Sequence, residues 1–223
     1  IRISTHSLLV NDANTSILKE NNVRVVELGI QSTSNRVLNA VGRPCDIDTV
    51  KKAVNSIKKY GLGLGLQLMP GLPEDEESIF LQSVKDVIAL EPSFVRIYPT
   101  LIIKNTQLYE MYKAGKYTPW SLDRMIVLVK EAMKKFKTAN IPIIRVGLHA
   151  DPSMLENFVA GPYHPSFRYL VDSLIARDEM TALIEQLNII PSVVTFIVPS
   201  REVSLYLGYK KDNIRNLKNK FGI

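Results

Sequence analysis

This chain of 223 residues has a single cysteine, Cys45, and no long apolar run. One thiol excludes an intrachain disulfide, and it excludes a thiolate-held cluster or zinc site built from this chain alone. Because a membrane-spanning helix needs about 20 apolar residues, we expect no membrane partner. Scarce cysteine is compatible with a reducing compartment, so we expect a cytoplasmic protein with no metal ligands of its own.

Positive charge, in contrast, is in excess. Lys and Arg number 28 against 22 Asp and Glu, which gives a net charge of +6 and a pI near 9.3. This balance favours an anionic partner such as nucleic acid. The alternative, which the charge alone favours more, is a Lys-rich protein without such a partner. The length suits one α/β domain with a small appendage.

The stretch from Arg24 to Pro73 organises the rest of the chain. Two short apolar strands, at Val23–Leu28 and Leu64–Met69, are separated by a helix that Asp46 caps. A strand–helix–strand unit of this kind predicts two parallel, adjacent strands. The polar, glycine-containing turns that follow both strands should then emerge at one edge of the sheet, where parallel sheets bind their ligands.

Strand and helix alternate five times up to Leu148, which predicts a parallel sheet with right-handed crossovers. Five strands are too few to close an eight-stranded barrel, so an open half-barrel and a doubly wound sheet both remain. The expected strands are 1–3, 23–28, 64–69, 94–98 and 142–148.

The regular alternation of strand and helix ends after Asp151. Two helices, Phe167–Ile175 and Glu179–Leu187, and a strand, Ser192–Val198, are expected there. We therefore divide the chain into a domain of residues 1–150 and a small α+β domain of residues 151–223, with the boundary between Asp151 and Gly161.

Several motifs together carry a family resemblance. They are ELGIQS at 27–32, LNAVGRP at 38–44, MPGLPED at 69–75, RIYPTLIIKNTQLYEMYKAGKY at 96–117 and GPYHPSFRYLVDS at 161–173. They resemble the later strands and C-terminal extension of radical S-adenosylmethionine (radical SAM) enzymes. Within that superfamily the chain is most similar to the Elongator catalytic subunit and its bacterial relatives, and more distantly to the oxygen-independent coproporphyrinogen oxidases.

The resemblance implies an α/β fold, a partial (β/α)6 TIM-like barrel of which this chain holds the later strands, followed by the small C-terminal domain. It implies S-adenosylmethionine and a [4Fe-4S] cluster as cofactors. The three cysteines that hold the cluster would precede Ile1, so we expect this chain alone to be inactive. The resemblance assigns no catalytic residue.

By the same resemblance, the cofactor contacts lie at the ends of four strands. They are Ser4 and Thr5 on the fourth strand, Glu27, Gly29, Gln31 and Ser32 on the fifth, Met69, Pro70 and Gly71 on the sixth, and Tyr98 with Thr100 on the seventh. The backbone amide and carbonyl of the sixth-strand turn would read the adenine edge. His6 and Cys45 depart from the family pattern, which bears on substrate identity more than on cofactor binding.

The residues themselves leave alternatives open. Glu27 lies in an otherwise apolar strand, and a buried carboxylate needs partners, so a structural ion pair competes with a ligand contact. Four arginines in or beside strands could pair with it: Arg2, Arg24, Arg96 and Arg145. Gln31 can donate to and accept from a nucleotide edge, but it can equally hydrogen-bond a neighbouring loop.

The most basic stretch lies near the C-terminus. LGYKKDNIRNL at 207–217 has the spacing of the turn and helix of a KH module, whose GxxG loop clamps a nucleic-acid backbone. Gly208 matches the first glycine, and Lys211 stands where the last should be. This predicts a KH-like element at 192–223 that contacts nucleic acid through Gly208, Lys210, Lys211 and Arg215. An amphipathic helix with a solvated basic face is the alternative.

Together these features predict part of a radical SAM enzyme that generates a 5′-deoxyadenosyl radical, with tRNA as its substrate. The alternatives are a porphyrinogen-type radical SAM oxidoreductase and a non-catalytic α/β domain that binds nucleic acid or protein. The sequence does not predict the oligomeric state.

Overall fold

The computed structural model describes residues 1–43, 45–148 and 151–223. Pro44, which closes one of the motifs quoted above, lies outside these residues. The chain divides into two compact units, Ile1–Pro165 and Ser166–Ile223, which are described separately.

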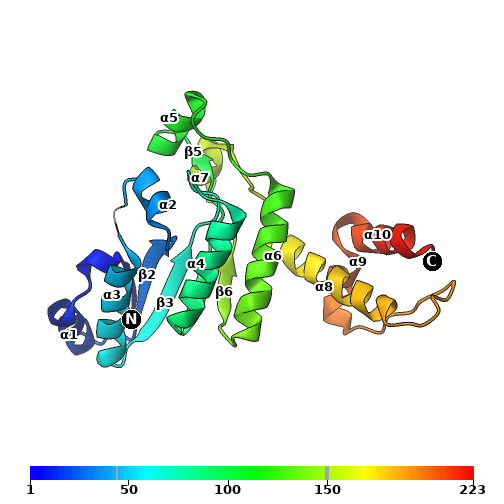
Figure 1. The fold of residues 1–223 in the computed structure, drawn as a ribbon, viewed down its shortest axis with the longest axis horizontal. Coiled ribbons are helices and arrows are strands. Elements are labelled where there is room, and N and C mark those ends of the chain that lie inside the picture. The colour runs from blue at the N-terminus through cyan, green and yellow to red at the C-terminus, as the bar shows by residue number, and fades with distance from the viewer. Residues whose placement is uncertain (44, 149–150) are drawn as a thin grey trace. The chain divides into compact units, whose positions relative to one another are not determined.

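The first unit is built on a parallel sheet of five strands (Figure 1). The strands are β1 (Arg2–Thr5), β2 (Val25–Gln31), β3 (Gly63–Leu68), β4 (Phe94–Ile97) and β6 (Ile143–Val146), and they lie in the order β1-β2-β3-β4-β6. Every pairing is parallel. The expected α/β fold is confirmed, and the described strands form no closed barrel.

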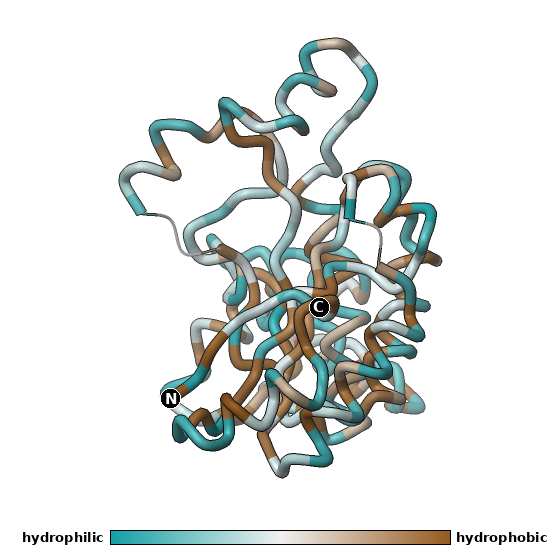
Figure 2. Tube along the Cα trace, turned by 90° about the vertical axis from the view of Figure 1, so that its left-hand side faces the viewer, coloured by the Kyte–Doolittle hydropathy of each residue, from teal (hydrophilic) through white to brown (hydrophobic). Residues whose placement is uncertain are grey.

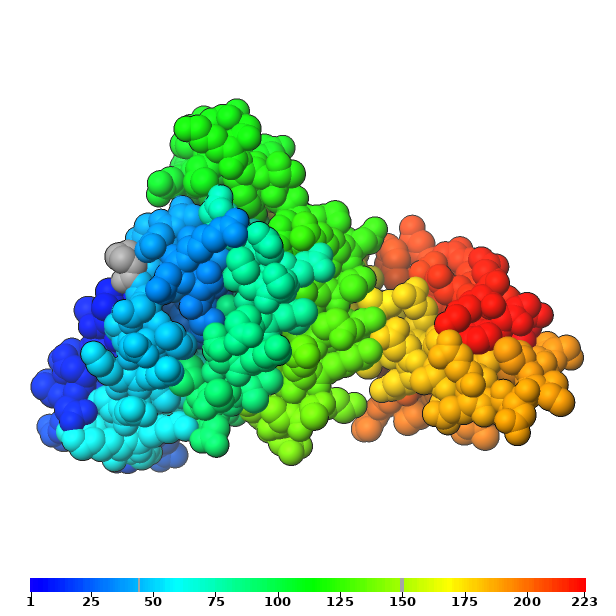
Figure 3. Space-filling model, in the orientation of Figure 1, coloured from blue at the N-terminus to red at the C-terminus, as the bar shows by residue number. Residues whose placement is uncertain are grey.

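Helices cover one face of this sheet. They are α1 (Asp12–Glu20), α2 (Asn35–Ala40), α3 (Ile47–Lys59), α4 (Glu77–Ala89) and α6 (Leu122–Thr138). Figure 1 shows α3, α4 and α6 in front of the strands, and Figure 3 shows how closely the side chains of α2, α3 and α4 cover this face. Strands added in sequence through right-handed crossovers place their helices on the same side, which explains the one-sided arrangement.

The helices begin where the sequence provides capping side chains. Asp46 accepts a hydrogen bond from the Thr49 amide (2.7 Å), and Ser121 caps α6 in the same way through the Arg124 amide (3.3 Å). Such caps satisfy backbone donors that the first turn leaves free. The apolar positions of the helices and strands meet in the interior, whereas the segment around α5 at the top of Figure 2 is largely hydrophilic.

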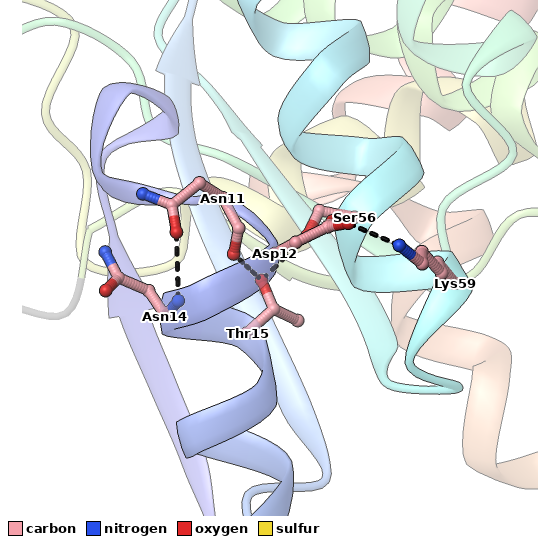
Figure 4. Close-up of polar contacts among 6 residues, drawn as sticks. All are labelled: Asn11, Asp12, Asn14, Thr15, Ser56 and Lys59. Carbon is pink, nitrogen blue, oxygen red and sulfur yellow. Dashed lines mark hydrogen bonds and ion pairs between the residues drawn. The ribbon is translucent and has the colours of Figure 1, made fainter.

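A polar seam joins α1 to α3 (Figure 4). Ser56 donates to Asp12 or to Thr15, with both oxygens 2.9 Å away, and Lys59 pairs with Asp12. Asn11 caps α1 by accepting from the Asn14 amide (2.9 Å). Since these groups satisfy one another, the seam is structural.

The first unit extends beyond residue 150. β5 (Ile102–Ile103) pairs antiparallel with β7 (Phe158–Ala160), and the Lys104 amide donates to the Asn157 carbonyl (2.8 Å). α7 (Pro152–Asn157) directly precedes β7, and α5 (Gln107–Lys113) follows β5. The division therefore falls at Pro165, later than the sequence boundary placed after residue 150.

The second unit is helical in the described structure. It contains α8 (Phe167–Glu185), α9 (Val203–Leu207) and α10 (Asp212–Phe221), and Met180, Ile184 and Leu217 form its buried core. Short 3₁₀ turns occur in the protein at η1 (Ser7–Leu9), η2 (Ser200–Glu202) and η3 (Tyr209–Lys211).

Two expectations about this unit need correction. The two expected helices are one continuous α8, because the intervening residues include no helix breaker. The expected strand at Ser192–Val198 is irregular: Val194 and Phe196 pack on the core while Ile197 is 98% exposed. The second unit offers this segment no partner strand among its described residues, so it is not the expected α+β domain.

Candidate functional site

Two faces of the sheet differ in chemistry. Since side chains alternate along a strand, the leucines of β3 point to the helices and Gly63, Gly65 and Gln67 point to the other face. On β2 the same alternation places Glu27 and Gly29 on that second face, which we call the polar face. The register shifts after Gly29, and the Gln31 side chain still lies on this face, because its Nε2 is 3.0 Å from where a Cβ at Gly29 would be. The register aligns Ser4, Glu27, Gly65 and Phe94 in one row across four strands.

Glu27 is the most unusual residue of the polar face, because its carboxylate is 2% exposed. Arg96 lies beside it, with Nε 3.3 Å from Oε1, and also donates from Nη1 to the Tyr98 hydroxyl (3.0 Å). Of the four candidate arginines, the structure thus selects Arg96. The second carboxylate oxygen, Oε2, has no hydrogen-bond partner among the described residues. A buried carboxylate oxygen without a donor is costly, so this atom calls for a partner that the described residues do not supply.

Gly65 gives the Phe94 ring its place on this face. A Cβ at position 65 would lie 2.4 Å from Cζ of Phe94 and 3.2 Å from Cγ of Glu27. The Arg2 guanidinium lies 5.9 Å from the centre of the same ring. The ring therefore occupies the space that a side chain at Gly65 would need, next to the buried carboxylate.

The end of β2 adds amide and guanidinium groups. Gln31 adopts a left-handed φ of 64° and is 9% exposed, and its side-chain oxygen accepts from Gln67 (3.4 Å). Arg43 donates from Nη2 to the Gly29 carbonyl (2.8 Å). The structure thus brings Glu27, Gly29 and Gln31 together on the polar face with Gln67, which the sequence analysis did not select as a cofactor contact.

The turn after β3 is held through its backbone. Gly71, with φ of 86°, donates its N–H to Asp75 (2.9 Å), and its carbonyl accepts from the Tyr117 hydroxyl (2.5 Å). The Pro70 carbonyl accepts from the Thr100 amide (3.0 Å). Both polar backbone groups of Gly71 are engaged within the protein. That the backbone of this turn reads an adenine edge stays a prediction. The Met69 carbonyl has no donor among the described residues and is the open group of this turn.

Two further candidate residues point away from the polar face. Thr5 lines an apolar pocket with Leu9, Val10 and residues of α1, on the opposite side of β1. Ser32 is buried, and its hydroxyl lies 3.3 Å from that of Ser83 on α4. Ser4 stays on the polar face in the exposed edge strand β1, in register with Glu27.

The two residues that depart from the family pattern have local structural roles. His6 caps the turn η1 by accepting from the Leu8 amide at Nδ1 (3.2 Å), while burial and the nearby Arg43 charge lower its pKa. Burial, followed by the charge of Asp46, raises the pKa of the Cys45 thiol. No group of three or more His, Cys, Asp or Glu suited to a metal ion occurs within residues 1–43, 45–148 and 151–223.

The predicted nucleic-acid residues lie around the turn between α9 and α10. Gly208 has φ of 79°, and a Cβ there would lie 2.8 Å from the Asn213 backbone nitrogen. Asn213 is buried and donates to the Ser173 carbonyl (2.8 Å) and the Leu205 carbonyl (3.0 Å), which fixes the turn. Lys210 and Lys211 are exposed, with φ of 51° and 62°. A helix–GYKK–helix arrangement is thus present, without a KH sheet in the described part of this unit.

Two family models match the chain. The radical SAM superfamily model matches residues 1–87, and the model of the radical SAM C-terminal domain matches residues 92–177. A parallel sheet with its strands in sequential order and its helices on one face is the arrangement found in TIM-like α/β enzymes. Within that class, the chain belongs to the radical SAM superfamily.

Known proteins agree with this assignment. The tRNA uridine(34) acetyltransferase of Methanocaldococcus jannaschii is 34% identical over 110 residues, which cover 48% of this chain and 20% of that protein. The structure of archaeal Methanocaldococcus infernus Elp3 has a TM-score of 0.67 at 23% identity, covering 80% of this chain and 42% of that one. Coproporphyrinogen III oxidase (HemN) from Escherichia coli has a TM-score of 0.52 at 17% identity, covering 62% and 32%. These two structures show a shared fold, and the chain spans about a fifth of the curated relative's length.

The sequence analysis missed several residues that shape this site, among them Arg43, Gln67, Asp75 and Tyr117. The quoted motifs include Arg43, Asp75 and Tyr117, but Tyr117 lies 46 residues from Gly71 in sequence. No local pattern pairs residues so far apart, so only the folded structure could identify this contact.

Proposed function

We propose that this chain is part of a radical SAM enzyme of tRNA modification, and that its polar face holds the adenosine part of S-adenosylmethionine. In this proposal the first unit is the later part of the partial barrel. The observation that carries the proposal is the buried Glu27 carboxylate, which has one oxygen without a donor among the described residues. Family membership and the tRNA relative support the reaction class and the substrate.

The groups on the polar face fit an adenosine. A carboxylate accepts hydrogen bonds from ribose hydroxyls, and the Gln31 and Gln67 amides can both donate and accept. The open Met69 carbonyl can accept from an exocyclic amine. The radical SAM family in general uses S-adenosylmethionine with a [4Fe-4S] cluster. S-adenosylmethionine held at such a cluster would supply radical, hydrogen-abstracting chemistry.

The residues of this chain cannot by themselves supply the ligands of the cluster. It has one cysteine, whereas a [4Fe-4S] cluster is held by several thiolates. The thiolates of the cluster would therefore come from residues outside this sequence, and we expect the chain alone to be inactive. The role of its own residues is to orient the nucleoside and exclude water, while the cofactor supplies the chemistry.

The deciding experiment uses the native full-length protein, reconstituted anaerobically with iron and sulfide. Iron content and 5′-deoxyadenosine formation are measured after reduction, with a heat-denatured sample as the control. Bound iron together with 5′-deoxyadenosine is the expected result. A well-folded protein that yields neither would contradict the proposal and favour a non-catalytic binding domain.

The substrate proposal has a structural basis in the second unit. From Val203 to Ile223 there are five Lys and Arg and one Asp, whereas α8 carries two Arg and four Asp and Glu. Of the cations, Arg215 contacts Asp212 (3.4 Å) and Lys220 contacts Glu185 (2.6 Å). Lys210 and Lys211 project from the fixed turn, and we propose that they contact tRNA phosphates together with Gly208 and Arg215. With tRNA as its substrate, the enzyme would act in the cytoplasm.

Charge reversal tests this surface. The double variant Lys210→Glu, Lys211→Glu should bind a tRNA transcript at least about tenfold more weakly, with a salt slope smaller by roughly two. The matched control reverses two neighbouring exposed lysines of α3, Lys51 and Lys52. Equal affinities for the two double variants, measured by fluorescence anisotropy, would exclude the turn as the RNA contact.

A further inference from the structure

The Gly71 turn is held by two side chains that act on opposite sides of one residue. Asp75 accepts from the Gly71 N–H with one oxygen (2.9 Å) and from the Glu76 N–H with the other (3.0 Å). Tyr117, 9% exposed, donates to the Gly71 carbonyl. Burial, followed by the Asp75 charge, raises the pKa of Tyr117, so its phenol remains a donor. Together these bonds fix both peptide planes of a glycine whose backbone would otherwise be the most mobile in the turn.

The side chains of Met125 and Trp120 pack against the same turn. A Cβ at Gly71 would lie 3.1 Å from Cε of Met125 and 3.5 Å from Cδ2 of Trp120. The Arg124 guanidinium lies 4.2 Å from the Trp120 ring centre and its Nε is 2.7 Å from Glu77. The Met125 and Trp120 side chains restrict Gly71 on that side, so the turn has little freedom to move away from the polar face.

We propose that Asp75 and Tyr117 are positioning residues, which hold the Gly71 turn so that the neighbouring Met69 carbonyl meets the ring of a bound nucleoside. This inference rests on the proposed cofactor role of the polar face. The Met69 amide donates to the Gln31 carbonyl (2.8 Å), which ties this residue to β2. No described residue donates to its carbonyl, and the orientation of that carbonyl depends on the two residues that follow it. A side chain that never touches the nucleoside can thereby change its affinity.

We call the bonds of Asp75 and Tyr117 to Gly71 the clamp, and the Asp75 bond depends on pH. Burial raises the pKa of Asp75 to about 6, while its two backbone donors and Arg124 on α6 oppose the shift and the adjacent Glu76 adds to it. Tyr117, the other titratable group facing it, stays protonated. Protonation of Asp75 turns one accepting oxygen into a donor that faces an N–H group. Below about pH 6 the Gly71 and Glu76 N–H groups therefore share one acceptor fewer, although the buried carboxyl itself is more stable uncharged, as its raised pKa indicates.

The only tryptophan of the chain reports on this turn. Trp120 is 9% exposed and lies under Gly71, so its fluorescence should change when Asp75 gains a proton. We expect a transition centred near pH 6 in the wild-type chain and none in Asp75→Asn. This readout requires neither cofactor nor activity.

Nucleoside affinity completes the test. S-adenosylhomocysteine is titrated calorimetrically into the 223-residue chain, into Asp75→Asn and Tyr117→Phe, and into the exposed controls Asp48→Asn and Tyr112→Phe. Each clamp variant should raise Kd by about 5–10-fold near pH 8, and wild type should lose affinity by a similar factor near pH 5. Circular dichroism verifies that every variant is folded, and Tyr117→Phe, which removes a single oxygen, keeps the test valid if Asp75→Asn is unstable.

The outcomes separate this inference from the proposed function. If wild type binds S-adenosylhomocysteine and both clamp variants bind it equally well, the positioning role is overturned and the proposed cofactor site stands. Absence of binding by wild type, with the fluorescence transition present, overturns both the cofactor site and the positioning role, because the clamp is then structural only. Weaker binding by both clamp variants, with unchanged controls, supports the inference.

Discussion

The two faces of the central sheet are made by the same strands and yet carry different chemistry. On β3, Leu64, Leu66 and Leu68 are at most 2% exposed beneath the helices, and the alternate positions hold Gly63, Gly65 and Gln67. A register slip of one residue would exchange these sets. The comparison teaches that one face supplies folding free energy, whereas the other holds a buried charge and open acceptors that folding alone does not require.

The largest expected effect is on the helix-covered face. Leu66→Ala removes a fully buried side chain and should cost about 2–5 kcal/mol in the free energy of unfolding, because a cavity remains. Urea denaturation measures the loss. The folded fraction should bind S-adenosylhomocysteine with wild-type affinity, and a loss of affinity in that fraction would mean that the two faces are not separable.

A second change tests the turn at the end of the polar face through pH. The folded pKa of Asp75 is about 6 against an ordinary 3.8, so its contribution to stability is greatest below the ordinary value and is lost as pH rises through about 6. The loss amounts to up to about 3 kcal/mol. Asp75→Asn should remove this pH dependence between about pH 4 and pH 8, as followed by urea denaturation. The same slope in wild type and variant would contradict the assignment.

A third change adds a methyl group to the polar face. In Gly65→Ala the new Cβ meets the Phe94 ring, which must swing away, at a cost of about 1–2 kcal/mol. The cost should shrink when Phe94 is also replaced by Ala. A double-mutant cycle measures this coupling, and additive effects of the two substitutions would show that the ring does not depend on Gly65.

The smallest expected effect on stability is at Glu27. Replacement of Glu27 by Gln keeps its shape and removes a buried charge with one unpaired oxygen, but it also leaves Arg96 without its partner. These two effects oppose each other, so the net change in the unfolding free energy should stay within about 1 kcal/mol. Affinity for S-adenosylhomocysteine should fall by about tenfold, because a charged acceptor is lost. Glu91→Gln, at an exposed glutamate that pairs with Lys58, is the matched control. Unchanged affinity in Glu27→Gln would reduce Glu27 to a structural ion pair.

Much of the first unit was predictable from local patterns. The strands and helices up to β6 lie near their expected positions, because apolar periodicity, caps such as Asp46 and glycine stops act within a few residues. The second unit was predicted less well. Ser192–Val198 has the composition of a strand, but a strand also needs a partner, which the described part of this unit does not provide.

The sequence by itself determined the alternation of strand and helix, the parallel direction of the strands and the family, since these depend on short motifs and on connection length. The order of the strands in the sheet came from the structure. Tertiary structure alone decided that Arg96 pairs with Glu27, that Tyr117 holds Gly71 and that Ser32 turns toward α4. Each of these contacts joins residues tens of positions apart, and each depends on strand register and helix packing. The physical reason is that a side chain selects its partner only after the backbone has brought the two within a few ångströms of each other.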